Sequence, residues 1–271
     1  MKQIIGFSGE QIPNKPDRAA ESKIVDKTPP KKSVVQVYFP QRNMELAYYN
    51  DAFDLKRGDM VYVDGKLEGK LGRVTEVNYN FKINLSYYKR VIAVVDTDVK
   101  GRFCFAGSHF VTFDRNALPA GKVLLWFKAP QNGDDEVVCG SGDTWFSLNE
   151  LEELSLRPGV SSQGYEYYRE DKVSYLCLDS SRGYAIVEGR DVYEVEFDYE
   201  DGRIGNIVCS CFCSYYCKHE FAVLLQLKEI LQHIEKHYRD EYIRSGYFAA
   251  VSRSTLYTFA FGGKESGSFT L

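Results

Sequence analysis

The sequence predicts an α+β protein of two domains: an N-terminal small antiparallel β-barrel-like domain, followed by a C-terminal domain with a β-sheet and a helix. Three observations lead to this expectation. Short runs of β-branched and aromatic residues recur about every ten residues from 34 to 128. An acidic stretch without Lys or Arg follows them. After it, further strand-like runs end in one long segment with helical apolar periodicity.

Length and composition are those of a globular protein. Of the 271 residues, 44% are hydrophobic and 27% are charged, which is sufficient for a sizeable core. The formal net charge is −4, so a contact with nucleic acid would need a local basic patch. No apolar run reaches membrane-spanning length, and the N-terminus lacks the apolar core of a signal peptide. We therefore expect a cytoplasmic, intracellular protein without a membrane partner.

Changes in composition divide the chain into five segments. The expected segments are a flexible tail (1–33), the barrel-like domain (34–128), an acidic linker (129–146), the sheet-and-helix domain (147–250) and a C-terminal strand or tail (251–271). Ser147 followed by Glu150 fits a helix capping box, so we expect a short helix at the start of the second domain.

Eight segments of the first domain have strand composition and are bounded by Gly, Asp, Asn or Pro. They are VVQVYF, MELAYYN, GDMVYVD, LGRVTEVNY, FKINLSY, VIAVVDT, HFVTFD and KVLLWF. The layout L-x-x-G-D-x-V-x-V followed by G-x-V-x-x-V resembles small SH3-like barrels. It also resembles the DNA-binding N-terminal domain of primosomal helicases, and this likeness covers about 45 residues.

Basic residues are concentrated in the middle of this domain. Between Leu55 and Arg102, ten basic residues stand against six acidic ones, with aromatic residues interleaved. Such a pattern can follow a phosphate backbone and offer rings for stacking on bases. The alternative is an ordinary solvated surface with tyrosines in the core. The candidate nucleic-acid-binding residues are Arg57, Lys70, Arg73, Lys82, Lys89 and Arg90.

The densest chemistry lies in VCSCFCSYYCKHEF, where four of the seven cysteines and one of the four histidines fall within eleven positions. A strand pattern ends in Cys209 and Cys211, whose side chains share a direction because residues two apart on a strand do. A helical stripe begins just after Cys217 and His219. In a reducing compartment, clustered cysteines indicate metal binding before disulfides. Three thiolates and one imidazole make a closed tetrahedral set for Zn²⁺.

This spacing, CSC-FCSYY-CKH with the continuation CKHEFAVLLQL, resembles the SWIM zinc finger, whose signature is C-x-C, a variable loop and C-x-H. Upstream, QGYEYYREDKVSYL and YAIVEGRDVYEVEF resemble the strands that precede the first cysteine in that family. The likeness extends from Gly164 to Leu227. It implies one structural zinc ion and binding to DNA or to other proteins. The favoured ligand set is Cys209, Cys211, Cys217 and His219.

Other interpretations of these residues remain open. The loop between the two pairs is short and contains Cys213. A second possible ligand set is therefore Cys211, Cys213, Cys217 and His219, which leaves only three residues between its two pairs. A thioredoxin-like centre needs Cys-x-x-Cys, which the sequence lacks. His233 and His237 stand in the order H-x-E-x-H and not in the H-E-x-x-H order of zinc proteases. We expect these two histidines beside the apolar stripe of the helix.

A closed zinc site leaves no free coordination position, and the sequence has no Walker A, G-x-S-x-G or G-x-G-x-x-G motif, so we expect no enzyme. SWIM domains occur in chromatin-remodelling-type helicases, transposases and bacterial proteins. The leading hypothesis is a zinc-stabilised module associated with DNA or RNA. The first alternative is a protein-interaction adaptor partnering a helicase, which the acidic stretch from Arg190 to Arg203 favours. The second is an enzyme with a dispersed site that uses zinc only as a scaffold.

Overall fold

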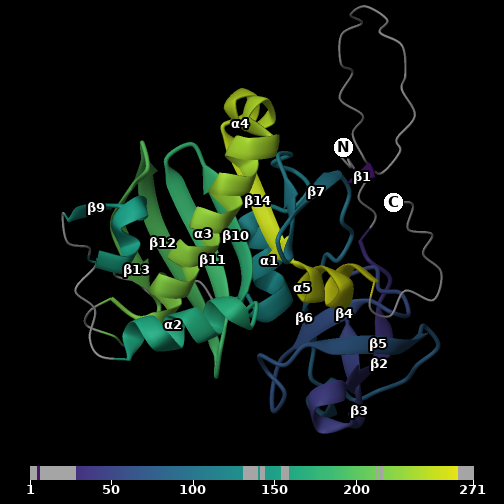
Figure 1. Cartoon of the computed structure of the whole chain (residues 1–271). Coiled ribbons are helices and arrows are strands. Elements are labelled where there is room, and N and C mark those ends of the chain that lie inside the picture. The colour runs from purple at the N-terminus through teal and green to yellow at the C-terminus, as the bar shows by residue number, and fades with distance from the viewer. Residues whose placement is uncertain are drawn as a thin grey trace, which may run out of the picture. The chain divides into compact units, whose positions relative to one another are not determined.

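The computed structural model describes residues 5–6, 29–130, 140, 144–153, 159–211, 213 and 216–261. They form two compact units, each described here by itself (Figure 1). The smaller unit contains residues 29–96, and the larger unit contains Ile5–Gly6 and the described residues from Thr97 onward. Each unit is built on an antiparallel sheet, and helices accompany the larger one, so the protein is of the α+β class.

Five antiparallel strands make the sheet of the smaller unit, in the order β3-β2-β5-β4-β6. These are β2 (Ser33–Phe39), β3 (Met44–Asn50), β4 (Met60–Val63), β5 (Gly72–Asn78) and β6 (Val91–Val95). Side chains of β2 alternate between buried and half-buried, as a strand with one face on a core requires. Val35, Val37 and Phe39 of β2 belong to the same apolar core as Val61 and Val63 of β4.

This sheet is not a closed barrel, which corrects the barrel-like expectation. Closure needs a continuous hydrogen-bonded ladder. Among the described residues, the two ends of the sheet are joined by one isolated bridge, between Tyr49 and Arg90. The expected strand FKINLSY is also absent from the described strands. In its place a 3₁₀ turn, Leu85–Tyr87, is capped by Asn84, whose side chain accepts a hydrogen bond from the Ser86 backbone.

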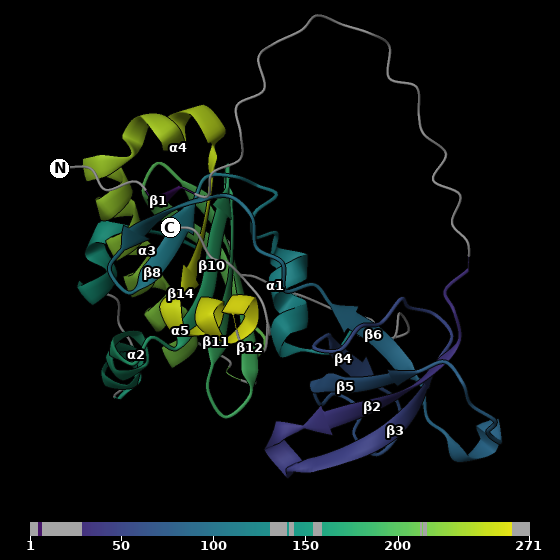
Figure 2. The same cartoon turned by 90° about the vertical axis from the view of Figure 1, so that its right-hand side faces the viewer.

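The larger unit contains a nine-stranded sheet in its described part, in the order β1-β7-β8-β14-β10-β11-β12-β13-β9 (Figure 2). The N-terminal strands are β1 (Ile5–Gly6), β7 (Arg102–Ala106), β8 (His109–Thr112) and β9 (Trp145–Ser147). The remaining strands are β10 (Val173–Asp179), β11 (Arg182–Glu188), β12 (Val192–Glu200), β13 (Arg203–Cys209) and β14 (Tyr247–Ser252). All strand pairs in the described part of this sheet are antiparallel.

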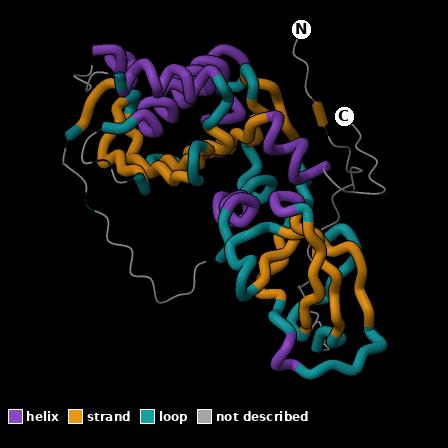
Figure 3. Tube along the Cα trace, turned by 90° about the horizontal axis from the view of Figure 1, so that it is seen from below, coloured by secondary structure: helices purple, strands orange, loops and turns teal. Residues whose placement is uncertain are grey.

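Two helices, α2 (Val160–Arg169) and α3 (Lys218–His237), cover one face of this sheet. Figure 3 shows them as a purple layer over the orange strands. The apolar stripe of α3, which includes Phe221, Leu224 and Leu227, packs with Leu176 of β10 and Val195 of β12 in one core. The helical periodicity expected after the cysteine cluster is therefore confirmed.

Shorter helices complete the larger unit. They are α1 (Ala120–Phe127), η3 (Leu148–Glu153), α4 (Arg239–Ser245), α5 (Arg253–Leu256) and a π turn (Tyr257–Phe261). Helix α1 corrects the expectation of a strand at KVLLWF. Val123 and Trp126, three residues apart, are both buried, and Trp126 stacks on Phe259 with ring centroids 5.1 Å apart. A short apolar run does not by itself distinguish a buried strand from a buried helix.

Strand β14 lies between β8 and β10, so the β7–β8 hairpin belongs to the larger sheet. The units therefore divide between Asp96 and Thr97, whereas the composition suggested a boundary near residue 128. At the C-terminus, the strand occupies 247–252, and helical turns follow it up to Phe261. Most of the expected tail (1–33), most of the expected linker (129–146) and residues 262–271 lie outside the described residues. Among the described helices, none is long and apolar enough to cross a bilayer.

Candidate metal centre

The cysteine and histidine side chains come from the end of a strand and the start of a helix. Cys209 is the last residue of β13, which pairs with β12, and Cys211 follows two residues later. Cys217 is the N-cap of α3, and His219 is in the first turn. Strand and helix are parts of one packed core, so the two halves of the cluster approach each other from opposite sides.

The start of α3 is held by a reciprocal pair of hydrogen bonds between Cys217 and Glu220. The Glu220 backbone N–H donates to the Cys217 sulfur at 3.5 Å, and the Cys217 backbone N–H donates to Glu220 Oε2 at 2.8 Å. This is a capping box in which a thiol replaces the usual hydroxyl. The hydrogen bonds that begin α3 thus also fix the position of the Cys217 sulfur.

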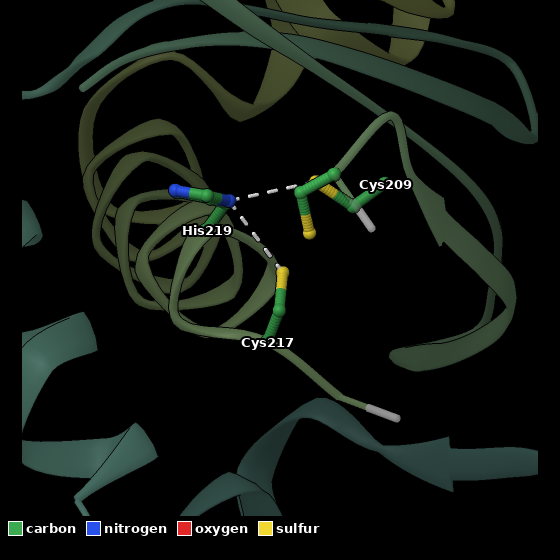
Figure 4. A group of neighbouring side chains, drawn as sticks. Cys209, Cys217 and His219 are labelled. Carbon is green, nitrogen blue, oxygen red and sulfur yellow. Dashed lines mark hydrogen bonds between the residues drawn. The ribbon is translucent and has the colours of Figure 1, made fainter. Parts of the chain in front are cut away.

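Figure 4 shows one ring nitrogen of His219 directed toward the sulfurs of Cys209 and Cys217. Nδ1 lies 3.7 Å from each of these two sulfurs. The donor atoms of all four residues, including Cys211, lie within 4.8 Å of one another. A tetrahedral ion with metal–sulfur bonds of about 2.3 Å and metal–nitrogen bonds of about 2.0 Å separates sulfur from nitrogen by roughly 3.5 Å. The donor set therefore fits one metal ion.

Burial favours the neutral forms of Cys211, Cys217 and His219. A hydrogen bond with Cys209, followed by burial, raises the pKa of the Cys217 thiol well above its ordinary value. Burial, followed by Cys217, raises the pKa of Cys211 to about 12. Burial, aided by the charge of Lys218, lowers the pKa of His219 to about 4, so the imidazole presents a lone pair at neutral pH. Metal binding at this site must therefore release thiol protons.

Two tyrosines enclose the His219 ring. Tyr193 of β12 stacks on it with ring centroids 4.0 Å apart, and Tyr167 of α2 meets it edge-on at 5.3 Å. Gly164 lets α2 approach α3 closely, since a Cβ there would lie 2.6 Å from the Phe221 ring. The other ring nitrogen of His219, Nε2, is buried without a hydrogen-bond partner in the described part of the chain.

Neither tyrosine is among the site residues expected from sequence. Both lie in the two segments whose patterns resemble SWIM domains. Their position in those patterns was the signal in the sequence that could have identified them as site residues. Their packing on His219 depends on the approach of α2 and β12 to α3, which no local pattern expresses. Lys218 adds a further contact, with its ammonium 4.6 Å from the centre of the Tyr167 ring.

Cys213 lies outside the four-residue group. Its side chain is exposed, while Cys209 and Cys211 are half-buried and Cys217 is buried. It contacts Cys211 through a side-chain hydrogen bond. The group that the structure brings together is thus the first of the two expected ligand sets, with Cys213 beside it.

The six candidate nucleic-acid-binding residues are all in the smaller unit, three on separate segments and three on one connection. Arg57 and Lys70 lie in connections on either side of β4, and Arg73 is half-buried on β5. Lys82, Lys89 and Arg90 share the connection between β5 and β6. Arg90 pairs with Asp51 at 2.5 Å and stacks over Tyr49 at 5.3 Å. Lys82 and Lys89 are exposed.

The fold and the site together define an α+β protein with a Cys₃His centre that can hold one metal ion. Comparison with protein-family models, curated proteins and solved structures finds no match to this chain.

Proposed function

We propose that the Cys₃His group is a structural zinc centre of the SWIM type. The observation that carries this proposal is the closed set of four donors, contributed by a strand end and a helix start, with Nδ1 of His219 3.7 Å from two sulfurs. Thiolate and imidazole ligands are the set that zinc prefers in structural sites. Four protein ligands leave no position for water or substrate, so we assign the ion no catalytic role.

In this proposal, four residues bind the ion and a fifth residue holds one of these ligands in position. Cys209 at the end of β13 and Cys211 two residues beyond it bind from one side. Cys217 at the N-cap of α3 and His219 in its first turn bind from the other, and Tyr193 holds the imidazole by stacking. When bound, zinc supplies folding free energy by joining these two elements. The SWIM assignment is supported by the C-x-C and C-x-H spacing and by the two strands that precede Cys209.

The purified protein should contain one zinc per chain, measured by atomic emission after exhaustive dialysis. X-ray absorption at the zinc edge should report three sulfur ligands and one nitrogen ligand. Substitution Cys213→Ser should leave both results unchanged. A protein that is folded but free of metal, or a site with fewer than three sulfurs, would contradict the assignment.

We further propose that the smaller unit associates with nucleic acid through the connection between β5 and β6. In it Tyr87 is 83% exposed and Leu85 is 51% exposed, beside the exposed Lys82 and Lys89. An exposed ring next to two cations can stack on a base while the cations approach its phosphates. Arg90 is less available, because it is paired with Asp51.

Gel-shift titrations with single- and double-stranded DNA and RNA at several salt concentrations test this association. Lys82→Gln combined with Lys89→Gln should weaken binding and reduce its salt dependence by about two phosphate contacts. The matched control is Lys236→Gln combined with Arg239→Gln, which removes the same charge from the larger unit. Binding that is insensitive to salt, or equally weakened in both variants, would refute the proposal.

A protein-interaction adaptor, partnering for example a helicase, is the second candidate. The observation in its favour is a groove of about 700 Å³ in the larger unit, lined by Asp179, Glu196 and Asp198 together with Arg115 and Arg182. Its carboxylates disfavour phosphate and suit a polar or basic protein segment. A stoichiometric partner captured from nuclease-treated extract should be lost with Glu196→Lys. It should be retained with Glu200→Lys, an exposed position on the same strand outside the groove.

A further inference from the structure

The C-terminal end of α3 carries a second pair of metal-ligating side chains, His233 and His237. Residues four apart on a helix lie on one face. The two imidazole rings are 4.7 Å apart, centroid to centroid, with planes inclined by 47°. From His219 to His233 the helix rises roughly 21 Å, at about 1.5 Å per residue, so this pair is separate from the Cys₃His centre.

His233 is oriented by a contact from the sheet. Its imidazole lies close to the backbone of Phe105, on β7. Its Nε2 atom is buried and has no hydrogen-bond partner within the described residues. A neutral imidazole carries one unprotonated ring nitrogen, which can serve as a metal ligand.

A buried ring nitrogen without a hydrogen-bond partner is unfavourable. Such a group in a folded protein indicates a missing partner, either a water molecule or an ion. A neighbouring imidazole is a suitable second ligand, and His237 is half-exposed, so solvent can complete the coordination. Glu229, one turn before His233, places a carboxylate near the pair and favours positive charge there.

We propose that His233 and His237 form a second, two-histidine site for a late first-row divalent cation such as Zn²⁺, Ni²⁺ or Cu²⁺. Imidazole is a ligand that these ions share, and hard cations such as Mg²⁺ prefer oxygen. Two protein ligands and solvent bind less tightly than a buried Cys₃His set, so this ion exchanges while the first is retained. The ion would bridge the last turns of α3, close to the contact between His233 and β7.

Isothermal titration of Zn²⁺ into protein that already holds its first equivalent tests this site. A second equivalent should bind, and its affinity should fall about tenfold or more in His237→Gln and in His233→Gln. The control is Lys236→Gln, an exposed position between the two histidines, which should keep the second equivalent. Atomic emission after dialysis should find the first zinc in all three variants, so the result is independent of the Cys₃His assignment.

Two results would overturn the proposal. One is the absence of any second equivalent up to millimolar Zn²⁺. The other is a second equivalent of unchanged affinity in His237→Gln, which would place the ion elsewhere, for example at Cys213. His233 packs against β7, so its variant can lose stability. The half-exposed His237 is then the deciding position.

Discussion

The two units of the molecule differ in what stabilises the fold of each. The smaller unit relies on an apolar core in which strands β2, β4 and β5 contribute valines, and all four histidines of the chain lie outside it. The larger unit has a more extensive core, yet it places three cysteines and a histidine where β13 meets α3. An apolar core folds without a ligand, whereas a buried set of thiols is completed by an ion. Metal removal should therefore lower the free energy of unfolding of the larger unit and leave that of the smaller unit unchanged.

The largest expected effect is the loss of the larger unit's fold in Cys217→Ser. This change removes a metal ligand, while the serine hydroxyl can still cap α3, and structural zinc sites contribute on the order of 10 kcal/mol of apparent binding free energy. NMR amide spectra should show collapsed signals for the larger unit and dispersed signals for residues 33–96. Cys213→Ser is the matched control, because Cys213 lies outside the donor group. Dispersed signals from both units in metal-free Cys217→Ser would contradict the claim that the larger unit depends on the metal for its fold.

A substitution in the smaller unit should have the reverse selectivity. A Cβ at Gly72 would overlap Val37 and lie 2.8 Å from the Phe39 ring, so Gly72→Ala should destabilise this unit by about 1–3 kcal/mol. Chemical denaturation followed by NMR should show an earlier transition for the smaller unit, with metal content unchanged. In the control, Gly121→Ala on α1, the added methyl meets no atom within 4 Å. A shift of the larger unit's transition by Gly72→Ala would show that the units do not unfold independently.

Acidification should also act on the larger unit alone through His109. This side chain is fully buried, with Nε2 2.7 Å from the Val173 carbonyl oxygen, and burial lowers its pKa. The unfolded chain, with an ordinary histidine pKa of about 6.5, then binds the proton more readily than the folded chain. Stability is complete above that value and falls as the pH drops below it toward the lowered pKa of the folded chain.

Denaturant titrations at pH 7.5 and 5.5 measure this loss. Comparison with His109→Gln isolates His109 from the other acid-sensitive groups, because only the wild-type chain carries its titration. An identical pH dependence in the two proteins would exclude His109 as the source. The smaller unit, without histidine, should change little over this interval.

The smallest expected effect is at Tyr193, whose ring stacks on His219. Tyr193→Leu keeps an apolar side chain but removes the aromatic pair, which is worth about 0.5–1.5 kcal/mol. Zinc should therefore be transferred several-fold more readily to a competing chelator. Tyr87→Leu, which changes an exposed ring in the smaller unit, is the control and should leave zinc retention unaltered.

Local patterns in the sequence are sufficient for the metal cluster and for most of the strands. Cys209 and Cys211 share a strand direction and Cys217 precedes a helical stripe, so their convergence follows from short-range geometry. The expectation at KVLLWF was wrong, because a short apolar run has no periodicity that separates strand from helix. The alternation in β2, in contrast, is long enough to specify both a strand and its buried face.

Local sequence patterns did not predict which strands pair when they are far apart in the sequence. The β7–β8 hairpin lies in the larger sheet because Val111 pairs with Ala250, a residue far along the chain. The stacking of Tyr193 on His219 and the closeness of His233 to Phe105 likewise depend on how separate elements pack. These contacts decide the surroundings of His219 and of His233, so the members of the Cys₃His group were predictable and their environment was not.

The central position of β14 has a consequence for the order in which a newly made chain can fold. Residues 33–96 contain every strand of the smaller sheet, so this unit can form as soon as they have left the ribosome. The hairpin at residues 102–112 must wait for residues 247–252, the strand that joins it to β10. Until then the Cys₃His ligands have been synthesised, but the sheet below them is in two parts. Ion capture can therefore precede sheet completion, and an early zinc ion would hold β13 against α3 while the last strand is made.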